Sequence, residues 1–91
     1  MFKITYHHKV SEDLALITLT AKKQIRKAIE EKLAIDPQFF GKPLQFSLKG
    51  LRSMRVGNYR VVFQLNPPEV FIVLIEHRST VYKNAEKRVD N

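Results

Sequence analysis

Two runs of strand-forming residues flank Gly57-Asn58, and this arrangement constrains the fold more than any other feature of the chain. The runs are Leu51–Val56 and Tyr59–Leu65. A two-residue loop that begins with glycine fits a type II′ turn, which joins neighbouring antiparallel strands. Because such a loop also sets the register of the strands, Arg55 is expected opposite Arg60. The C-terminal half of the chain therefore predicts a β-hairpin.

One strand and two helices are predicted before the hairpin. Residues Phe2–His7 alternate apolar and polar side chains, which is typical of a half-buried strand. Ser11 is a favourable N-cap for a short helix. Thr20 can cap a second helix, which must end before Asp36-Pro37 because the residue preceding a proline avoids helical geometry. The second helix has an apolar stripe that we expect to pack on the sheet, formed by Ile25, Ala28, Ile29 and Leu33.

The remaining segments complete the predicted sheet. Asp36–Leu48 contains a glycine and two prolines and is predicted to be a loop. Val70–Ile75 is apolar throughout, as expected of a central strand covered on both faces. Thr80–Asp90 is compatible with a short helix or a partly detached tail. The loop is expected to be held on the core by its large apolar side chains, Phe39, Phe40, Leu44 and Phe46.

These elements predict an α+β fold in a single domain that spans residues 1–91. An N-terminal strand, a helical hairpin and a three-stranded antiparallel meander would form one mostly antiparallel four-stranded sheet, followed by a short C-terminal tail or helix. A length of 91 residues suits one domain, and an apolar content of 44% argues against disorder.

Composition excludes several classes of protein. The chain has no cysteine, which excludes disulfides and thiolate metal sites. Its apolar runs are too short to span a bilayer, and the N-terminus lacks the apolar region of a signal peptide. His7-His8 are adjacent on a strand and face opposite ways, so no metal site is expected there. We therefore expect a cytoplasmic protein without a membrane partner, metal or cofactor.

Charge points to a polyanionic partner. Sixteen Lys and Arg face nine Asp and Glu, a formal net charge of +7. Net charge alone promotes solubility and attracts polyanions without choosing between them. No acidic residue occurs from Pro37 to Pro68. That window holds five basic residues, which are Lys42, Lys49, Arg52, Arg55 and Arg60.

The predicted pairing of Arg55 with Arg60 is unfavourable for folding alone. Directly opposed strand residues have Cβ atoms about 5 Å apart on one face, and like charges there are destabilising. An anion between the two guanidiniums would remove the repulsion and add charge-assisted hydrogen bonds. Ser53 lies on the same face. The alternative is that both side chains lie at an exposed rim and avoid each other through their length.

The end of the last strand contributes a second set of polar groups. Histidine is the side chain whose ordinary pKa suits acid–base chemistry near neutral pH, which makes His77 a candidate. Arg78 follows it directly, and Tyr82 could stack on a base or donate a hydrogen bond to phosphate. The alternative is that His77 makes a local hydrogen bond and that Tyr82 covers the core.

Two motifs resemble the RelE/ParE toxin superfamily. The segment Leu48–Phe63, which reads Leu-Lys-Gly-Leu-Arg-Ser-Met-Arg-Val-Gly-Asn-Tyr-Arg-Val-Val-Phe, closely resembles the superfamily hairpin. The segment His77–Tyr82 is similar to its His-Arg-x-x-Val-Tyr signature, and Asp36-Pro37 matches its layout. The resemblance implies a fold of the microbial ribonuclease type and a cognate antitoxin. It also implies cleavage of mRNA in the ribosomal A site, through attack of the 2′-hydroxyl on the adjacent phosphate.

The resemblance assigns roles to individual residues. Arg60 matches a phosphate-stabilising arginine, and Arg55 matches a basic position on the preceding strand. Arg78 matches a phosphate binder or proton donor, and Tyr82 matches a stacking or proton-transfer group. His77 is a substitute candidate for proton transfer. Further RNA contacts are expected from Lys49, Arg52, Ser53 and Lys83.

Ser53 is a departure from the superfamily pattern. Some RelE proteins carry two basic residues, two positions apart, on the strand before the hairpin, and Ser53 occupies the first of these positions. The identity of the general base is therefore open. A noncatalytic homologue that only binds its antitoxin stays possible for the same reason.

The ParE branch provides another alternative, because its members inhibit DNA gyrase without catalysis. Members of that branch usually lack the terminal Val-Tyr, which is present here as Val81-Tyr82. This ending and the arginine pair favour the ribonuclease.

Overall fold

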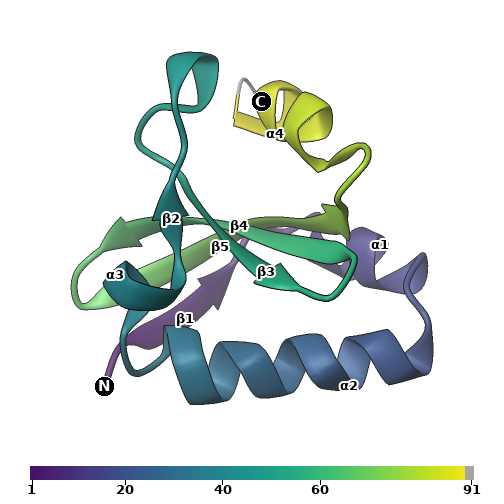
Figure 1. Ribbon diagram of the computed structural model, residues 1–91, viewed down its shortest axis with the longest axis horizontal. Coiled ribbons are helices and arrows are strands. Elements are labelled where there is room, and N and C mark those ends of the chain that lie inside the picture. The colour runs from purple at the N-terminus through teal and green to yellow at the C-terminus, as the bar shows by residue number, and fades with distance from the viewer. Residues whose placement is uncertain (90–91) are drawn as a thin grey trace.

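A five-stranded sheet forms the centre of the computed structural model, which describes residues 1–89. The strand order is β1-β5-β4-β3-β2, and β1 runs parallel to β5 while the other neighbours are antiparallel (Figure 1). The predicted α+β class is confirmed, with one more strand than the four predicted. The strands are β1 Lys3–Tyr6, β2 Lys42–Pro43, β3 Arg52–Val56, β4 Tyr59–Asn66 and β5 Glu69–His77.

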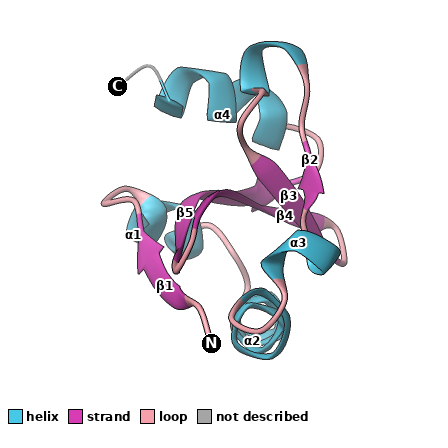
Figure 2. Ribbon diagram, turned by 90° about the vertical axis from the view of Figure 1, so that its left-hand side faces the viewer, coloured by secondary structure: helices cyan, strands magenta, loops and turns pink. Residues whose placement is uncertain are grey.

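Helices cover both faces of the sheet. Figure 2 shows α2 on one side of the strands and α4 on the other. On the first side lie α1 (Val10–Ala15) and α2 (Leu19–Ala28), and α2 continues into a π-helical turn over Ile29–Leu33. On the other side lies α4 (Val81–Val89). The sheet is therefore the middle of three layers.

The α2 side holds the larger core. The predicted stripe of α2 is buried and meets the inward side chains of β3, β4 and β5. Both helices start two residues earlier than predicted. Thr18, rather than Thr20, caps α2 by accepting a hydrogen bond from Ala21 N, and α1 begins after Lys9 without a side-chain cap from Ser11. The buried core residues are Val10, Ile17, Ile25, Ala28, Ile29, Leu33, Met54, Val61, Phe63, Val70, Ile72 and Ile75.

The α4 side holds a smaller core. Its buried members are Leu48, Leu51, Val62, Val73, Leu74, Val81 and Ala85. Strand β5 contributes to both cores, which confirms the prediction of a central strand covered on both faces. The predicted short C-terminal helix is confirmed, whereas its partial detachment was a wrong prediction for the described residues, because α4 is packed through Val81 and Ala85. Asp90, the end of that predicted tail, lies outside the described residues.

The predicted loop Asp36–Leu48 is more ordered than expected. It contains α3 (Pro37–Phe40), the short strand β2 and a 3₁₀ turn at Phe46–Leu48. The Asp36 carboxylate accepts a hydrogen bond from Phe39 N, so the Asp-Pro pair acts as N-cap and first residue of α3.

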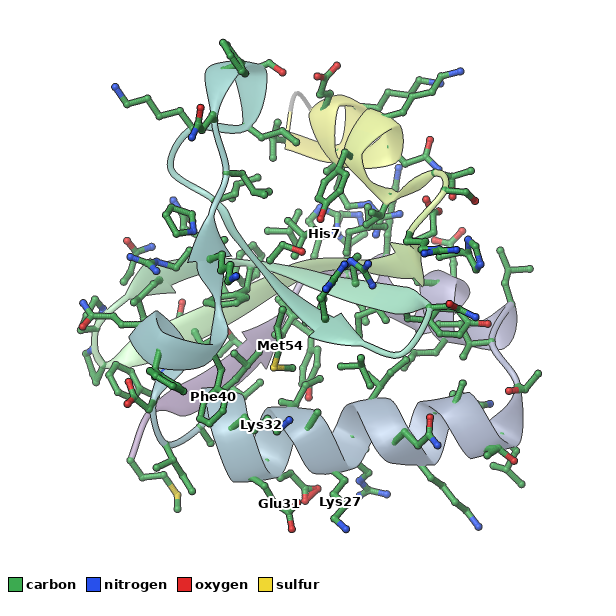
Figure 3. The ribbon with its side chains drawn as sticks, viewed as in Figure 1. His7, Lys27, Glu31, Lys32, Phe40 and Met54 are labelled. Carbon is green, nitrogen blue, oxygen red and sulfur yellow. The ribbon has the colours of Figure 1, made fainter. Side chains whose placement is uncertain are left out.

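Only two of the four apolar anchors predicted for this segment pack on a core. Phe40 lies against the larger core and Leu44 against the smaller one, whereas Phe39 is 75% exposed and Phe46 is 92% exposed. Lys32 Nζ lies 5.5 Å from the centroid of the Phe40 ring (Figure 3). Within residues 1–89, no helix combines the length and apolar character needed to cross a bilayer.

Candidate functional site

The β3–β4 hairpin places Arg55 opposite Arg60, as predicted. Gly57 adopts a φ of +59°, and Asn58 does not share the left-handed conformation. A positive φ at the first loop position alone is the pattern of a type II′ turn. The two arginines therefore share one face of the sheet, on the side of α4.

The two guanidiniums differ in their surroundings. Arg60 is 7% exposed, and its Nη1 donates to Gly57 O at 3.1 Å and to Tyr59 O at 2.8 Å. Arg55 is exposed. Among residues 1–89, neither arginine has a carboxylate within 4.0 Å. The turn carbonyls thus hold Arg60 in place, and no carboxylate among residues 1–89 forms an ion pair with it.

A hollow opens between the hairpin and the start of α4. Its lining contains four cationic side chains and no acidic one. Five of the residues predicted for the site meet there. The lining residues are Lys42, Leu44, Ser53, Arg55, Arg60, Arg78, Ser79 and Tyr82. This arrangement can bind a phosphate group through several charge-assisted hydrogen bonds.

Tyr82 enters the hollow from the first turn of α4. Its hydroxyl lies 3.3 Å from Ser53 Oγ, and its side chain is partly open to solvent at 38% exposure. Ser53 itself is buried. A phenol held in this way can stack on a base or take part in proton transfer.

Glu76 lies on the arginine face and was not predicted as part of this region. It pairs with Arg60 across β4 and β5. Its Oε2 accepts hydrogen bonds from Thr80 Oγ1 at 2.8 Å and from Asn84 Nδ2 at 2.7 Å. Counting the register back from the β4–β5 turn would have placed Ile75 opposite Arg60, because a β-bulge between Val62 and Phe63 shifts the pairing by one residue. The carboxylate ties the start of α4 to the sheet next to the hollow.

His77 lies on the opposite face from the arginine pair. It pairs with Tyr59, and their rings meet edge to face with centroids 5.8 Å apart. Its Nδ1 lies 2.8 Å from Ser79 Oγ and accepts a hydrogen bond from Ser79 N. His77 does not line the hollow. The geometry thus gives no support to the proton-transfer role suggested for His77, because a strand turns adjacent residues to opposite faces.

The expected RNA-contacting residues divide into two groups. Ser53 lines the hollow, whereas Lys49 and Lys83 are exposed outside it. Arg52 also lies outside, because its Nη1 donates to Gly41 O at 2.8 Å and so holds the segment between α3 and β2. Lys42 lines the hollow in place of these residues, and it was missed because β2 was not predicted.

A separate groove lies on the other side of the sheet. It runs between α1, α2 and the end of β1, and its apolar lining includes Leu14, Leu19 and Ile25. Three cations of α2 border it, namely Lys22, Lys23 and Arg26. His7 lies at one end, where burial lowers the pKa of its imidazole, with a further contribution from His8. The groove presents apolar surface beside positive charge.

Comparisons with known proteins identify the family. A sequence model of the family described as "ParE toxin of type II toxin-antitoxin system, parDE" matches residues 4–82. The toxin RelE of Mycobacterium tuberculosis is 35% identical to this chain, over 74% of the chain and 82% of its own length. The toxin in the RelBE2 toxin–antitoxin complex of the same organism superposes with a TM-score of 0.79 at 24% identity, covering 85% of this chain and 98% of that one. The isolated E. coli RelE toxin superposes with a TM-score of 0.69 at 20% identity, covering 98% and 99%. The chain therefore belongs to the RelE/ParE superfamily of toxins from type II toxin–antitoxin systems.

Proposed function

We propose that this chain is a single-domain cytoplasmic toxin, residues 1–91, that cleaves mRNA in the A site of the ribosome. One observation carries the proposal. Four cations, Lys42, Arg55, Arg60 and Arg78, surround a hollow without any acidic side chain in its lining. Arg60 is buried between Arg55 of β3 and Glu76 of β5, and the Glu76 carboxylate accepts hydrogen bonds from the start of α4 instead of forming an ion pair with Arg60. Its opposed like charge at Arg55 is therefore destabilising unless an anion lies between the two arginines.

The chemistry proposed for the hollow is internal phosphoryl transfer. The 2′-oxygen bonds to phosphorus as the bond to the 5′-oxygen breaks, which leaves a 2′,3′-cyclic phosphate and a 5′-hydroxyl. Negative charge builds up on the phosphorane, and preorganised donors stabilise such charge best. Arg60 suits this role because the turn carbonyls already fix its guanidinium. Arg55 shares the phosphate from the opposite strand.

The proton transfers are assigned only in part. Arg78 or Tyr82 supplies a proton to the departing 5′-oxygen, since both line the hollow. Tyr82 also offers a ring on which a base can stack. The group that takes the proton from the 2′-hydroxyl stays unassigned, with Tyr82 the candidate inside the hollow and His77 the candidate outside it. No step in this scheme needs a metal or cofactor.

The test is to map the 5′ ends of mRNA in a translating extract that contains the toxin. Cleavage within codons is expected, and Arg60→Ala or Arg78→Ala should reduce the rate about 10²- to 10³-fold, as loss of a transition-state donor does. Lys27→Ala is the matched control, because Lys27 is an exposed cation of α2 outside the hollow. Its rate should equal that of the wild-type toxin. Uncleaved mRNA would contradict the proposal.

The second candidate function is inhibition of DNA gyrase, which the ParE description of the matching family favours. A supercoiling assay with purified gyrase separates the two functions. Blocked supercoiling together with intact mRNA would establish the gyrase inhibitor. If both activities are absent, the remaining candidate is a noncatalytic homologue that only binds its antitoxin.

We also propose a cognate antitoxin as partner, because RelE relatives are seen in toxin–antitoxin complexes. The groove beside α2 suits an amphipathic segment with acidic residues, since apolar anchors would enter it and carboxylates would meet its three cations. Leu19→Asp, at the groove, should weaken binding of the co-expressed antitoxin by at least about tenfold. Leu16→Asp is the control, because Leu16 is 85% exposed and lies outside the groove. Equal affinities for the two variants would refute this placement.

A further inference from the structure

A buried ion pair joins the two ends of the chain. Asp13 of α1 is 7% exposed, and its Oδ2 lies 2.6 Å from Arg88 Nη1 of α4. The Arg88 side chain is only 14% exposed. The other ion pair among the described residues, Arg26 with Glu30, lies on the surface of α2. Asp13 and Arg88 are therefore the pair that burial makes costly to separate.

The same two side chains complete the backbone hydrogen bonding of β5. Strand β1 accompanies β5 only as far as Ile72, so the following residues of β5 have no strand on that side. There Asp13 Oδ2 accepts a hydrogen bond from Ile75 N at 3.1 Å, and Arg88 Nη1 donates to Val73 O at 3.2 Å. The ion pair thus occupies the place of a continued strand and satisfies two buried backbone groups.

Arg88 lies near the end of the helix whose first turn carries Tyr82. The separation is roughly two turns, or about 9 Å along the helix axis. Neither Asp13 nor Arg88 lines the hollow. The start of α4 is held separately, by the bonds of Glu76 to Thr80 and Asn84. Polar contacts thus tie both ends of α4 to the sheet, Ser47 Oγ donates a hydrogen bond to Glu86 between them, and the Tyr82 hydroxyl lies beside Ser53.

We propose that the Asp13–Arg88 pair is a positioning device that holds α4 so that Tyr82 projects into the hollow. The catalytic part of this inference rests on the proposed ribonuclease function. Asp13 and Arg88 act through Tyr82 and touch no substrate. Loss of the pair lets the end of α4 separate from β5, which moves Tyr82 relative to the arginines of the hairpin.

The first measurement is amide hydrogen exchange by NMR in Arg88→Met, which keeps the aliphatic part of the side chain and removes its charge. The amides of α4, including that of Tyr82, should exchange about tenfold faster, while those of β3 and β4 keep their protection. Lys87→Met is the matched control, because Lys87 is an exposed neighbour on the same helix. Asp13→Asn should behave as Arg88→Met does. Unchanged exchange in α4 would overturn the proposal, and so would loosening of the whole domain.

The second measurement is the kinetics of mRNA cleavage. Arg88→Met should lower kcat about 10- to 100-fold with little change in KM, as displacement of a positioned group does. Arg88→Lys should recover part of the loss, since it restores the charge facing Asp13. In a Tyr82→Ala background, which removes both the hydroxyl and the stacking ring, Arg88→Met should cause no further loss. An additional loss in that background would show that Arg88 does not act through Tyr82.

The two measurements together distinguish an error in the proposed function from an error in the proposed role of the Asp13–Arg88 pair. If the wild-type toxin cleaves no mRNA, the proposed function is wrong, and amide exchange at Tyr82 still decides whether the pair holds this residue in place. If the toxin cleaves mRNA and Arg88→Met matches Lys87→Met in both rate and exchange, the positioning device alone is wrong.

Discussion

The two faces of the sheet differ in what they bury. The α2 face buries apolar side chains from β3, β4 and β5 against α1 and α2. The α4 face buries Ser53 and Arg60 beside a smaller apolar core. On that face β3 and β4 present Ser53, Arg55 and Arg60, where the α2 face presents Met54 and Val61. Because period-2 alternation separates these sets, one hairpin can serve stability on one face and anion binding on the other. Alternate residues of β3 and β4 thus supply the apolar core on one face and the arginine pair on the other.

Removal of a large aromatic side chain should show most strongly that the core on the α2 face contributes more to stability than the core on the α4 face. Phe63 is fully buried in the larger core, so Phe63→Ala should lower the free energy of unfolding by about 3–5 kcal/mol. That is a large share of the roughly 5–15 kcal/mol that small domains have. Phe71 is only partly buried, against the smaller core, and Phe71→Ala should cost less than half as much. Urea denaturation measures both values. Equal losses would show that the two cores contribute alike.

The hairpin and the helix α2 were predictable because local rules determine them. A two-residue loop with an initial glycine leaves one register for β3 and β4, so the pairing of Arg55 with Arg60 followed from the sequence. The stripe of α2 repeats at helical spacing and is buried as expected. The parallel pairing of β1 with β5 could not be read in this way, because it joins segments far apart in the chain.

The hairpin part of the site was predictable from local rules, and Arg78 and Tyr82 were predicted from the motif that follows the last strand. Ser53, Arg55 and Arg60 share a face by alternation alone. Arg88 of α4 meets Asp13 of α1, a contact that no local pattern indicates. The exposure of Phe46 could not be predicted either. The hydropathy of phenylalanine favours burial and does not indicate the positive φ that Phe46 adopts. In contrast, Asp36-Pro37 is a local signal for the start of α3. It was not used, because the glycine and prolines of Asp36–Leu48 led to the prediction of a loop.

Overpacking tests whether the α2 face is as tightly filled as a core should be. A Cβ added at Gly41 would overlap the ring of Phe63, so Gly41→Ala should destabilise the protein by about 1–3 kcal/mol. Phe63→Leu removes the ring atoms that clash with this Cβ. Gly41→Ala should therefore lower the free energy of unfolding less in a Phe63→Leu background than in the wild-type protein. Urea denaturation of the four proteins in this cycle gives the coupling between the two sites. Strict additivity would mean that the ring moves aside freely.

The arginine face should respond with the opposite sign. Arg55→Gln removes one of two opposed like charges, and the free energy of unfolding should rise by about 0.2–1 kcal/mol at low ionic strength. Cleavage of mRNA should fall at the same time. Added phosphate should raise the Tm of the wild-type protein more than that of the variant, because the anion relieves the repulsion. Lys49→Gln, which removes an exposed cation outside the hollow, is the control. A loss of stability in Arg55→Gln would mean that repulsion between Arg55 and Arg60 does not destabilise the fold.

The smallest expected effect concerns the imidazole of His7, the residue that directly follows β1. Burial lowers the pKa of His7, and the neighbouring His8 adds to the effect. Its Nδ1 also accepts the Lys9 N–H at 3.1 Å, which requires that nitrogen to be unprotonated. Since the folded pKa lies below the unfolded value, the unfolded chain binds more protons in the interval between them. The stabilisation is therefore complete above an unfolded pKa of about 6.5 and declines as pH falls through the interval. Thermal melts from about pH 7.5 to 5 should show a shallower fall in Tm for His7→Gln than for the wild-type protein. Parallel curves for His7→Gln and the wild-type protein would mean that the surroundings of His7, which include the Phe71 ring, tolerate a charge as readily as water does.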